Sequence, residues 1–249
     1  MEFWVLVGCF FLIATVYSSV GFGGGSSYLA LLALPVWMLT PPVIRPVALM
    51  CNIVVVSGSA WVFLRRESFR FSDWWPYLLP SVPLAWLGGQ WKISDHGFFL
   101  LLGFTLLVAS VLLWIRPSTT LHPVSGSGQV WKKATLSGGI GFLSGLVSIG
   151  GGIFLSPLMH LFNWDTPRRI AAMAGLFILV NSVSGLLGQF RNGLPPLEIS
   201  FVLPLLAAVL VGGQAGSRIG AGWFNPLYIR RVTALVVMVA ALLILKDHW

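Results

Sequence analysis

Ten apolar segments divide almost the whole chain, and this division constrains the fold more than any other feature. None of them carries an acidic residue in its middle, because each Asp and Glu lies at or beyond a segment end. A helix needs about 20 residues to cross the apolar core of a bilayer, and most segments approach that length. The segments lie at roughly 3–20, 26–39, 43–64, 74–91, 97–115, 134–149, 153–163, 170–190, 198–216 and 228–246.

The composition agrees with this division. The chain is 57% hydrophobic and 9% charged, whereas a soluble domain carries about 25% charged residues. The sequence therefore predicts an all-α, polytopic integral membrane protein whose first partner is the lipid bilayer. The net charge of +8 comes from Lys and Arg in the loops, which is the usual bias of cytoplasmic loops and does not indicate nucleic-acid binding.

Two halves of the chain repeat the same landmarks. The linker 116–133 separates a first transmembrane repeat, 1–115, from a second, 134–249. Gly23-Gly24-Gly25 recurs as Gly150-Gly151-Gly152 (150 − 23 = 127), Ser57-Gly58 as Ser184-Gly185 (184 − 57 = 127), and Gly88-Gly89-Gln90 as Gly212-Gly213-Gln214 (212 − 88 = 124).

The positive charges indicate how the halves are oriented. If each Gly run turns a helical hairpin back to its own side, three further spans follow, and the halves lie inverted in the membrane. With the N-terminus outside, four of the 15 Lys and Arg residues lie outside and the other eleven inside (15 − 4 = 11). The outer four are Arg45, Lys92, Arg191 and Lys246. If each Gly run instead only interrupts one crossing, the same 15 residues divide almost evenly, with eight on one side of the membrane and seven on the other.

The positive-inside rule thus favours two inverted-topology repeats, each a Gly-broken helical hairpin plus three transmembrane helices. The 65–73 loop, the 116–133 linker and the 217–231 loop are predicted to be cytoplasmic, with both termini outside. Inverted repeats with interrupted helices at matching positions are typical of secondary transporters, whose binding site lies where the interruptions meet.

The Gly runs are the first candidate substrate-binding residues. A helix N-terminus offers free N–H groups and the positive end of the helix dipole, and Gly lets an anion approach the backbone. The first run precedes a predicted short helix at 28–39, and the second precedes one at 153–163. The alternative is that these glycines only permit close helix crossings. The candidate residues are Gly23, Gly24, Gly25, Ser26, Ser27, Gly150, Gly151 and Gly152.

Five further polar residues are candidates. Asn52 and Asn181 lie near the middle of the third segment of each half, where they bind substrate or form an interhelical hydrogen bond. The secondary candidates are Arg45, Gln90 and Gln214. Arg45 either attracts an anion or anchors its helix at the membrane interface. The two glutamines are expected chiefly to pack against other helices or to cap helix ends. Cys9, Cys51 and the four His residues show no metal-ligand spacing, so neither metal nor cofactor is expected.

The paired stretches GFGGGSSYLALLALP and SGLVSIGGGIFLSPLM, each followed by a Pro-basic-Ala stretch (PPVIRPVA, TPRRIAAMA), resemble the TauE/SafE family of sulfite and sulfonate exporters. The resemblance covers essentially the whole chain. It implies a permease in the bacterial or archaeal cytoplasmic (inner) membrane that moves small anions such as sulfite or organosulfonates. One departure is Pro46, where the second half has Ile170.

The sequence thus predicts a secondary membrane transporter, an exporter of small anions, and no enzyme. Alternatives are a non-transporting subunit of a larger complex, or a transporter of thiosulfate or a carboxylate. An intramembrane enzyme would need a nucleophile–base or metal cluster, and a cation transporter would favour intramembrane carboxylates. The sequence shows neither, and it has no Walker A motif. Whether the chain forms a homo-oligomer is left open.

Overall fold

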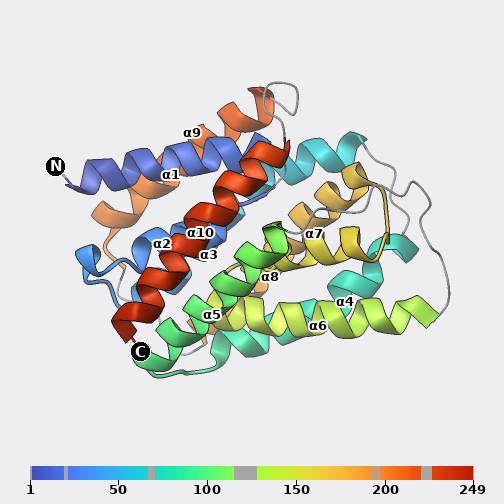
Figure 1. Cartoon of the computed structure of the whole chain (residues 1–249), viewed down its shortest axis with the longest axis horizontal. Helices are drawn as coiled ribbons and strands as arrows, with labels where there is room; N and C mark the ends of the chain where they lie inside the picture. Colours follow the sequence, from blue (N-terminus) through green and yellow to red (C-terminus); the bar gives the residue numbers. More distant parts are fainter. Residues whose placement is uncertain are drawn as a thin grey trace.

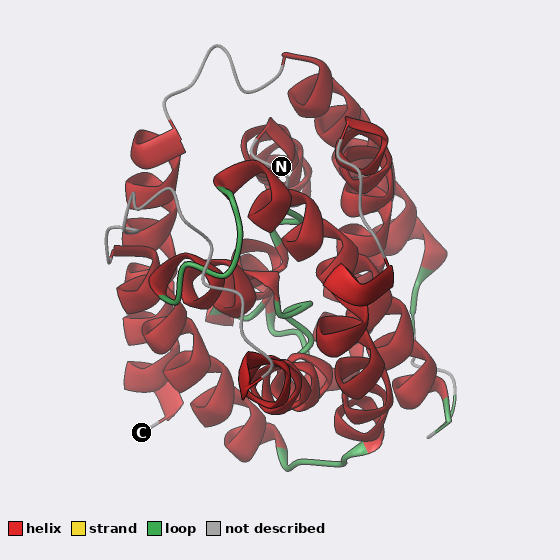
Figure 2. Cartoon of the chain, turned by 90° about the vertical axis from the view of Figure 1, so that its right-hand side faces the viewer, coloured by secondary structure: helices red, strands yellow, loops and turns green. Residues whose placement is uncertain are grey.

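The computed structural model describes residues 2–19, 22–66, 71–114, 128–191, 193, 197–219 and 226–248. This part of the chain is helical and contains no strand (Figure 2). The helices are α1 (Glu2–Ser19), α2 (Gly25–Leu32), α3 (Pro41–Arg66), α4 (Phe71–Gln90), α5 (Asp95–Trp114), α6 (Gly128–Val147), α7 (Gly152–Leu161), α8 (Pro167–Phe190), α9 (Ile199–Ile219) and α10 (Pro226–His248), with one 3-10 turn, η1 (Pro35–Trp37).

Four of the described helices are long and apolar enough to cross a bilayer. These spans are Pro41–Gly58 in α3, Asp95–Trp114 in α5, Arg169–Phe190 in α8 and Ile199–Arg218 in α9. Shorter apolar helices occur at Phe3–Ser19 and Gly152–Leu161. The prediction of an all-α polytopic membrane protein is therefore confirmed.

Each of the ten predicted segments contains one described helix, but some boundaries differ. α2 begins at Gly25 rather than 28 and ends at Leu32, because Pro35 has no N–H with which to continue the helix. α6 begins at Gly128, so residues 128–133 of the predicted linker are helical. Residues 116–127 of that linker lie outside the described residues.

The helices pair across the two halves of the chain. α1 lies beside α9 along one edge of the molecule, α4 lies beside α6 along the opposite edge, and α5 packs on α10 (Figure 1). α3 contacts both α8 and α9, and α8 contacts both α3 and α4. If each helix of α1–α5 is exchanged with its counterpart in α6–α10, the α1–α9 pair becomes the α6–α4 pair and the α3–α9 pair becomes the α8–α4 pair. The α5–α10 and α3–α8 pairs are each exchanged with themselves. This is the pairing expected of two repeats related by a two-fold axis, and the inverted repeat itself stays a prediction.

Glycines allow the edge pairs to approach closely. A Cβ on Gly145 of α6 would press on the backbone of Ala85 in α4, and a Cβ on Gly88 would press on the carbonyl of Phe142. At the other edge, Gly212 and Gly216 of α9 meet the carbonyls of α1 in the same way. Small residues at such crossings bring backbones into van der Waals contact, which is the main attraction between helices in lipid.

The directions of the paired helices bear on the orientation of the halves. α5 and α10 run antiparallel, because Phe99 stacks on His248 while Gly103, farther along α5, lies against Leu245. An inverted arrangement requires this direction, whereas four spans in each half would make the two helices parallel. The orientation of the halves in a membrane stays a prediction.

A labelling experiment tests that orientation. In a Cys9→Ala, Cys51→Ala background, a membrane-impermeant maleimide should label Lys92→Cys on intact cells. It should label Ser125→Cys only after permeabilisation, because the linker is predicted to be cytoplasmic. Labelling of position 125 from outside would contradict the inverted arrangement.

Candidate functional site

Each Gly run forms a turn at which the chain reverses. Gly24 and Gly151 are the N-caps of α2 and α7, with φ of 79° and 80°. This left-handed region is open to Gly but costs other residues free energy. α2 folds back on α1, so that the rings of Phe10 and Tyr28 stack with centroids 4.7 Å apart. The hairpin expected at the first run is therefore present in the structure.

Asn52 of α3 joins the two turns. Its side chain is fully buried, and Nδ2 donates a hydrogen bond to the carbonyl of Ile149 at 3.1 Å. A Cβ on Gly25 would lie 2.7 Å from both Asn52 Oδ1 and the Ile149 carbonyl oxygen. A Cβ on Gly150 would lie 2.9 Å from Asn52 Nδ2. We call this region, Gly23–Gly25, Gly150–Gly152 and Asn52, the Gly junction.

Four polar side-chain atoms at the Gly junction have no hydrogen-bond partner among the described residues. They are Asn52 Oδ1, Tyr28 OH, Ser144 Oγ and Ser182 Oγ, and all four residues are 0% exposed. Buried polar groups in folded proteins nearly always have a partner, so such a group calls for an explanation. Each of these side chains lies beside one of the two Gly turns, so the turns carry polar groups whose hydrogen-bonding capacity is unused in the described structure.

These atoms lie directly against the glycines. A Cβ on Gly150 would be 3.1 Å from Ser182 Oγ, one on Gly151 3.2 Å from Ser144 Cβ, and one on Gly24 3.2 Å from Tyr28 OH. The glycines thus let the backbone pack closely against these side chains, because an added Cβ would crowd them.

The other predicted candidates are placed as follows. Ser26 and Ser27 lie in the first turn of α2 and are 2% exposed, and Ser27 Oγ is 2.7 Å from Tyr17 OH. Asn181 is also buried, but its Nδ2 donates to the Phe177 carbonyl of its own helix at 2.8 Å. Asn181 Oδ1 has no hydrogen-bond partner among the described residues, and the adjacent residue, Ser182, lies against Gly150.

The two glutamines lie in helix contacts. Gln90 Nε2 donates to the Trp86 carbonyl at 3.4 Å, one turn back in α4. Gln214 of α9 packs against α3, since a Cβ on Gly58 would be 2.8 Å from its Nε2. These contacts agree with the packing or capping role preferred for both.

Arg45 lies near the start of the Pro41–Gly58 span, and its role as an anion attractor or an interfacial anchor stays a prediction. Its half-buried side chain points to α4 and α6, where it donates to Ser148 Oγ at 3.4 Å, to the Gly89 carbonyl at 3.3 Å and to the Gly145 carbonyl at 3.4 Å.

Sequence reasoning missed Tyr28, Ser144, Ser148 and Ser182. The sequence contained some indications of these residues. Ser144 and Ser148 are four residues apart before the second Gly run, a spacing that puts both on one helix face, and Ser182 directly follows Asn181. Only the fold shows that Tyr28 turns back toward Gly24.

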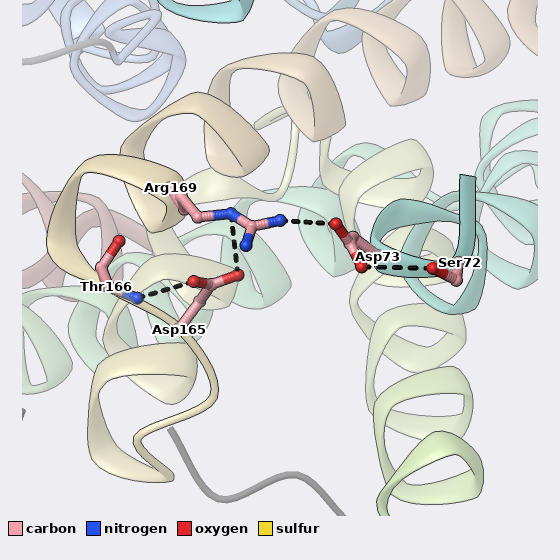
Figure 3. A network of polar contacts seen from close by, with 5 residues as sticks. All are labelled: Ser72, Asp73, Asp165, Thr166 and Arg169. Atoms are coloured by element: carbon pink, nitrogen blue, oxygen red, sulfur yellow. Dashed lines mark hydrogen bonds and ion pairs between the residues drawn. The ribbon is translucent and has the colours of Figure 1, made fainter. Parts of the chain in front are cut away.

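A charged network joins the halves at the start of α4 and α8 (Figure 3). Arg169 of α8 pairs with Asp73 of α4 at 2.6 Å and with Asp165 at 3.4 Å. Asp165 also accepts a hydrogen bond from the Thr166 N–H at 2.8 Å. Within the described part of the chain, no three His, Cys, Asp or Glu side chains gather as a metal-holding group.

Comparisons with known proteins agree with a membrane carrier. The profile of a family described as "Sulfite exporter TauE/SafE" matches residues 6–244. "Probable membrane transporter protein y4hK" of Sinorhizobium fredii is 30% identical, with 95% of each chain covered. "Probable membrane transporter protein YunE" of Bacillus subtilis is 21% identical, with 98% of each covered. No solved structure matches the chain.

Replacing the N-cap glycines tests the junction. Gly24→Ala and Gly151→Ala should each lower the free energy of unfolding by about 1–2 kcal/mol, because a Cβ disfavours positive φ. Gly139→Ala is the matched control, since no atom lies within 4 Å of its added Cβ. Thermal unfolding in detergent measures the difference. Equal melting temperatures for Gly139→Ala and the other two variants would contradict the geometry.

Proposed function

The chain belongs to the TauE/SafE sulfite exporter family and is a multi-pass membrane transporter; we propose that it moves small oxyanions, namely sulfite or organosulfonates, and binds them at the Gly junction. The membrane is proposed to be the bacterial or archaeal cytoplasmic membrane, and the direction to be export. No enzymatic step and no cofactor is included in this proposal.

The unpartnered polar groups around the two Gly turns carry this proposal. Tyr28, Ser144 and Ser182 present hydroxyl groups without a partner in the described structure. The N-termini of α2 and α7 add N–H groups and the positive ends of two helix dipoles. A sulfite or sulfonate group has three oxygens that accept such hydrogen bonds.

Asn52 adds an acceptor to this set of donors. Its Oδ1 has no partner in the described structure while its Nδ2 is engaged by Ile149. An acceptor beside an anion site suits a substrate that also carries a proton, such as the hydroxyl of bisulfite or the ammonium group of an aminosulfonate.

Thiosulfate and small carboxylates fit the same donors and remain the second candidates. A non-transporting subunit is disfavoured because both relatives are named as transporters. Flux measurements on proteoliposomes with sulfite, thiosulfate, an organosulfonate and acetate decide among the substrates.

The unpartnered hydroxyls allow binding to be separated from folding. Ser144→Ala and Ser182→Ala should leave the melting temperature unchanged or higher, because each removes a buried hydroxyl that has no partner. Each should reduce anion flux about tenfold or more, because a hydrogen bond to a charged group is worth about 1.5–3 kcal/mol.

Ser184→Ala is the matched control. Ser184 Oγ donates to the Val82 carbonyl at 2.6 Å, so this variant should lose about 1 kcal/mol of stability and keep its flux per folded protein. Normal flux in both Ser144→Ala and Ser182→Ala would contradict binding at the Gly junction.

The driving force is open to a separate test. One charge that crosses the membrane gains about 2.3 kcal/mol per 100 mV, and an anion leaves a negative cell downhill. We expect electrogenic efflux that follows a potassium potential set with valinomycin in liposomes. Flux that ignores the potential but follows an imposed proton or sodium gradient would replace uniport with coupled transport.

A further inference from the structure

Arg45 is a cation inside a span whose described partners are all neutral. It lies in the Pro41–Gly58 span, and it donates to one hydroxyl and two backbone carbonyls. Among the described residues, both ion pairs belong to Arg169, and neither involves Arg45. A charge that is half-buried in a membrane protein is costly without a counter-charge.

Hydrogen-bond donors converge beside this cation. Ser148 Oγ accepts from Arg45 Nε at 3.4 Å and from Gln189 Nε2 at 2.9 Å. Both lone pairs of the hydroxyl oxygen are then used, so its proton is available to an acceptor. Arg45, Ser148 and Gln189 therefore present a guanidinium, a hydroxyl and an amide, and no carboxylate.

This group adjoins the Gly junction without being part of it. Ser148 immediately precedes Ile149, whose carbonyl binds Asn52. Arg45 and Asn52 are seven residues apart, so they share one face of α3 with a separation of about 10 Å. Arg45 lies near the start of α3, and Gly89 and Gln189 lie near the ends of α4 and α8. All three positions are predicted to lie toward the outer surface.

We propose that Arg45, Ser148 and Gln189 form a second oxyanion site, between the Gly junction and the outer surface. This inference rests on the proposed function and extends it. The hydrogen bonds of Arg45 in the described structure come from Nε and Nη2, so the Nη1 group of the guanidinium donates to an oxygen of the sulfite or sulfonate group. Because the site holds a full positive charge, it favours dianions over monoanions.

Equilibrium binding to purified protein in detergent tests the charge preference. The probes are sulfite at alkaline pH, where it is a dianion, and methanesulfonate, a monoanion. Arg45→Gln should weaken methanesulfonate about tenfold and sulfite about a hundredfold, because the Coulomb energy doubles with the charge of the ligand. Arg45→Lys keeps the charge and should weaken sulfite less than Arg45→Gln does.

Two further variants make the test decisive. Gln189→Glu has the shape of the native residue but places a carboxylate beside Arg45, so it should also weaken sulfite more than methanesulfonate. If Arg45→Gln does not fold, the affinities of Gln189→Glu for the two anions test the second site instead. Lys92→Gln removes one charge from an exposed residue on the same predicted side and should change neither affinity.

The outcomes separate this site from the Gly junction. Unchanged affinities in folded Arg45→Gln and Gln189→Glu, or equal losses for both anions, would overturn the second site while wild-type binding upholds the proposed function. Failure of the wild type to bind either probe would overturn both.

Discussion

The hydrogen bond from Asn52 to the Ile149 carbonyl is the interaction on which the centre of the structure depends. Helices broken inside a bilayer expose backbone groups that lipid cannot satisfy, so the protein itself must supply their partners. Asn52 does this from a third helix and brings both Gly turns to one place. Because the glycines at 25 and 150 have no Cβ, the amide can lie against the backbone of both runs.

Much of the fold could be predicted from the sequence, because segment length and apolarity determine where helices form in a membrane. The Gly runs that contain Gly24 and Gly151 indicated where the chain reverses its direction. The partners of Asn52 and Arg45 could not be predicted, because they lie 44 to 103 residues away in the chain. Only the packing of the helices brings them together. The ends of α2 also differ from the prediction, since the left-handed N-cap at Gly24 starts this helix at Gly25 rather than at 28.

The helix pairing is nearly two-fold, but the chemistry around the junction is not. α2 begins with Gly25, Ser26 and Ser27, whereas α7 begins with Gly152, Ile153 and Phe154. The hydroxyls on the second side come instead from α6 and α8, through Ser144 and Ser182. The polar lining is thus assembled from different elements in each half, so exchanging the halves would not reproduce the same set of contacts for a ligand.

The distribution of charge follows a related logic. The proposed binding site at the junction contains neutral groups, namely hydroxyls, an amide and helix ends. A transporter must bind its substrate and also release it, and neutral groups suit that requirement. A full charge at the centre would cost more in desolvation and would retain a dianion more tightly. Arg169 is neutralised by Asp73 and Asp165 at the opposite end of the molecule, whereas Arg45 faces neutral groups. In the predicted orientation, the paired Arg169 lies toward the inner surface and Arg45, with its neutral partners, toward the outer surface.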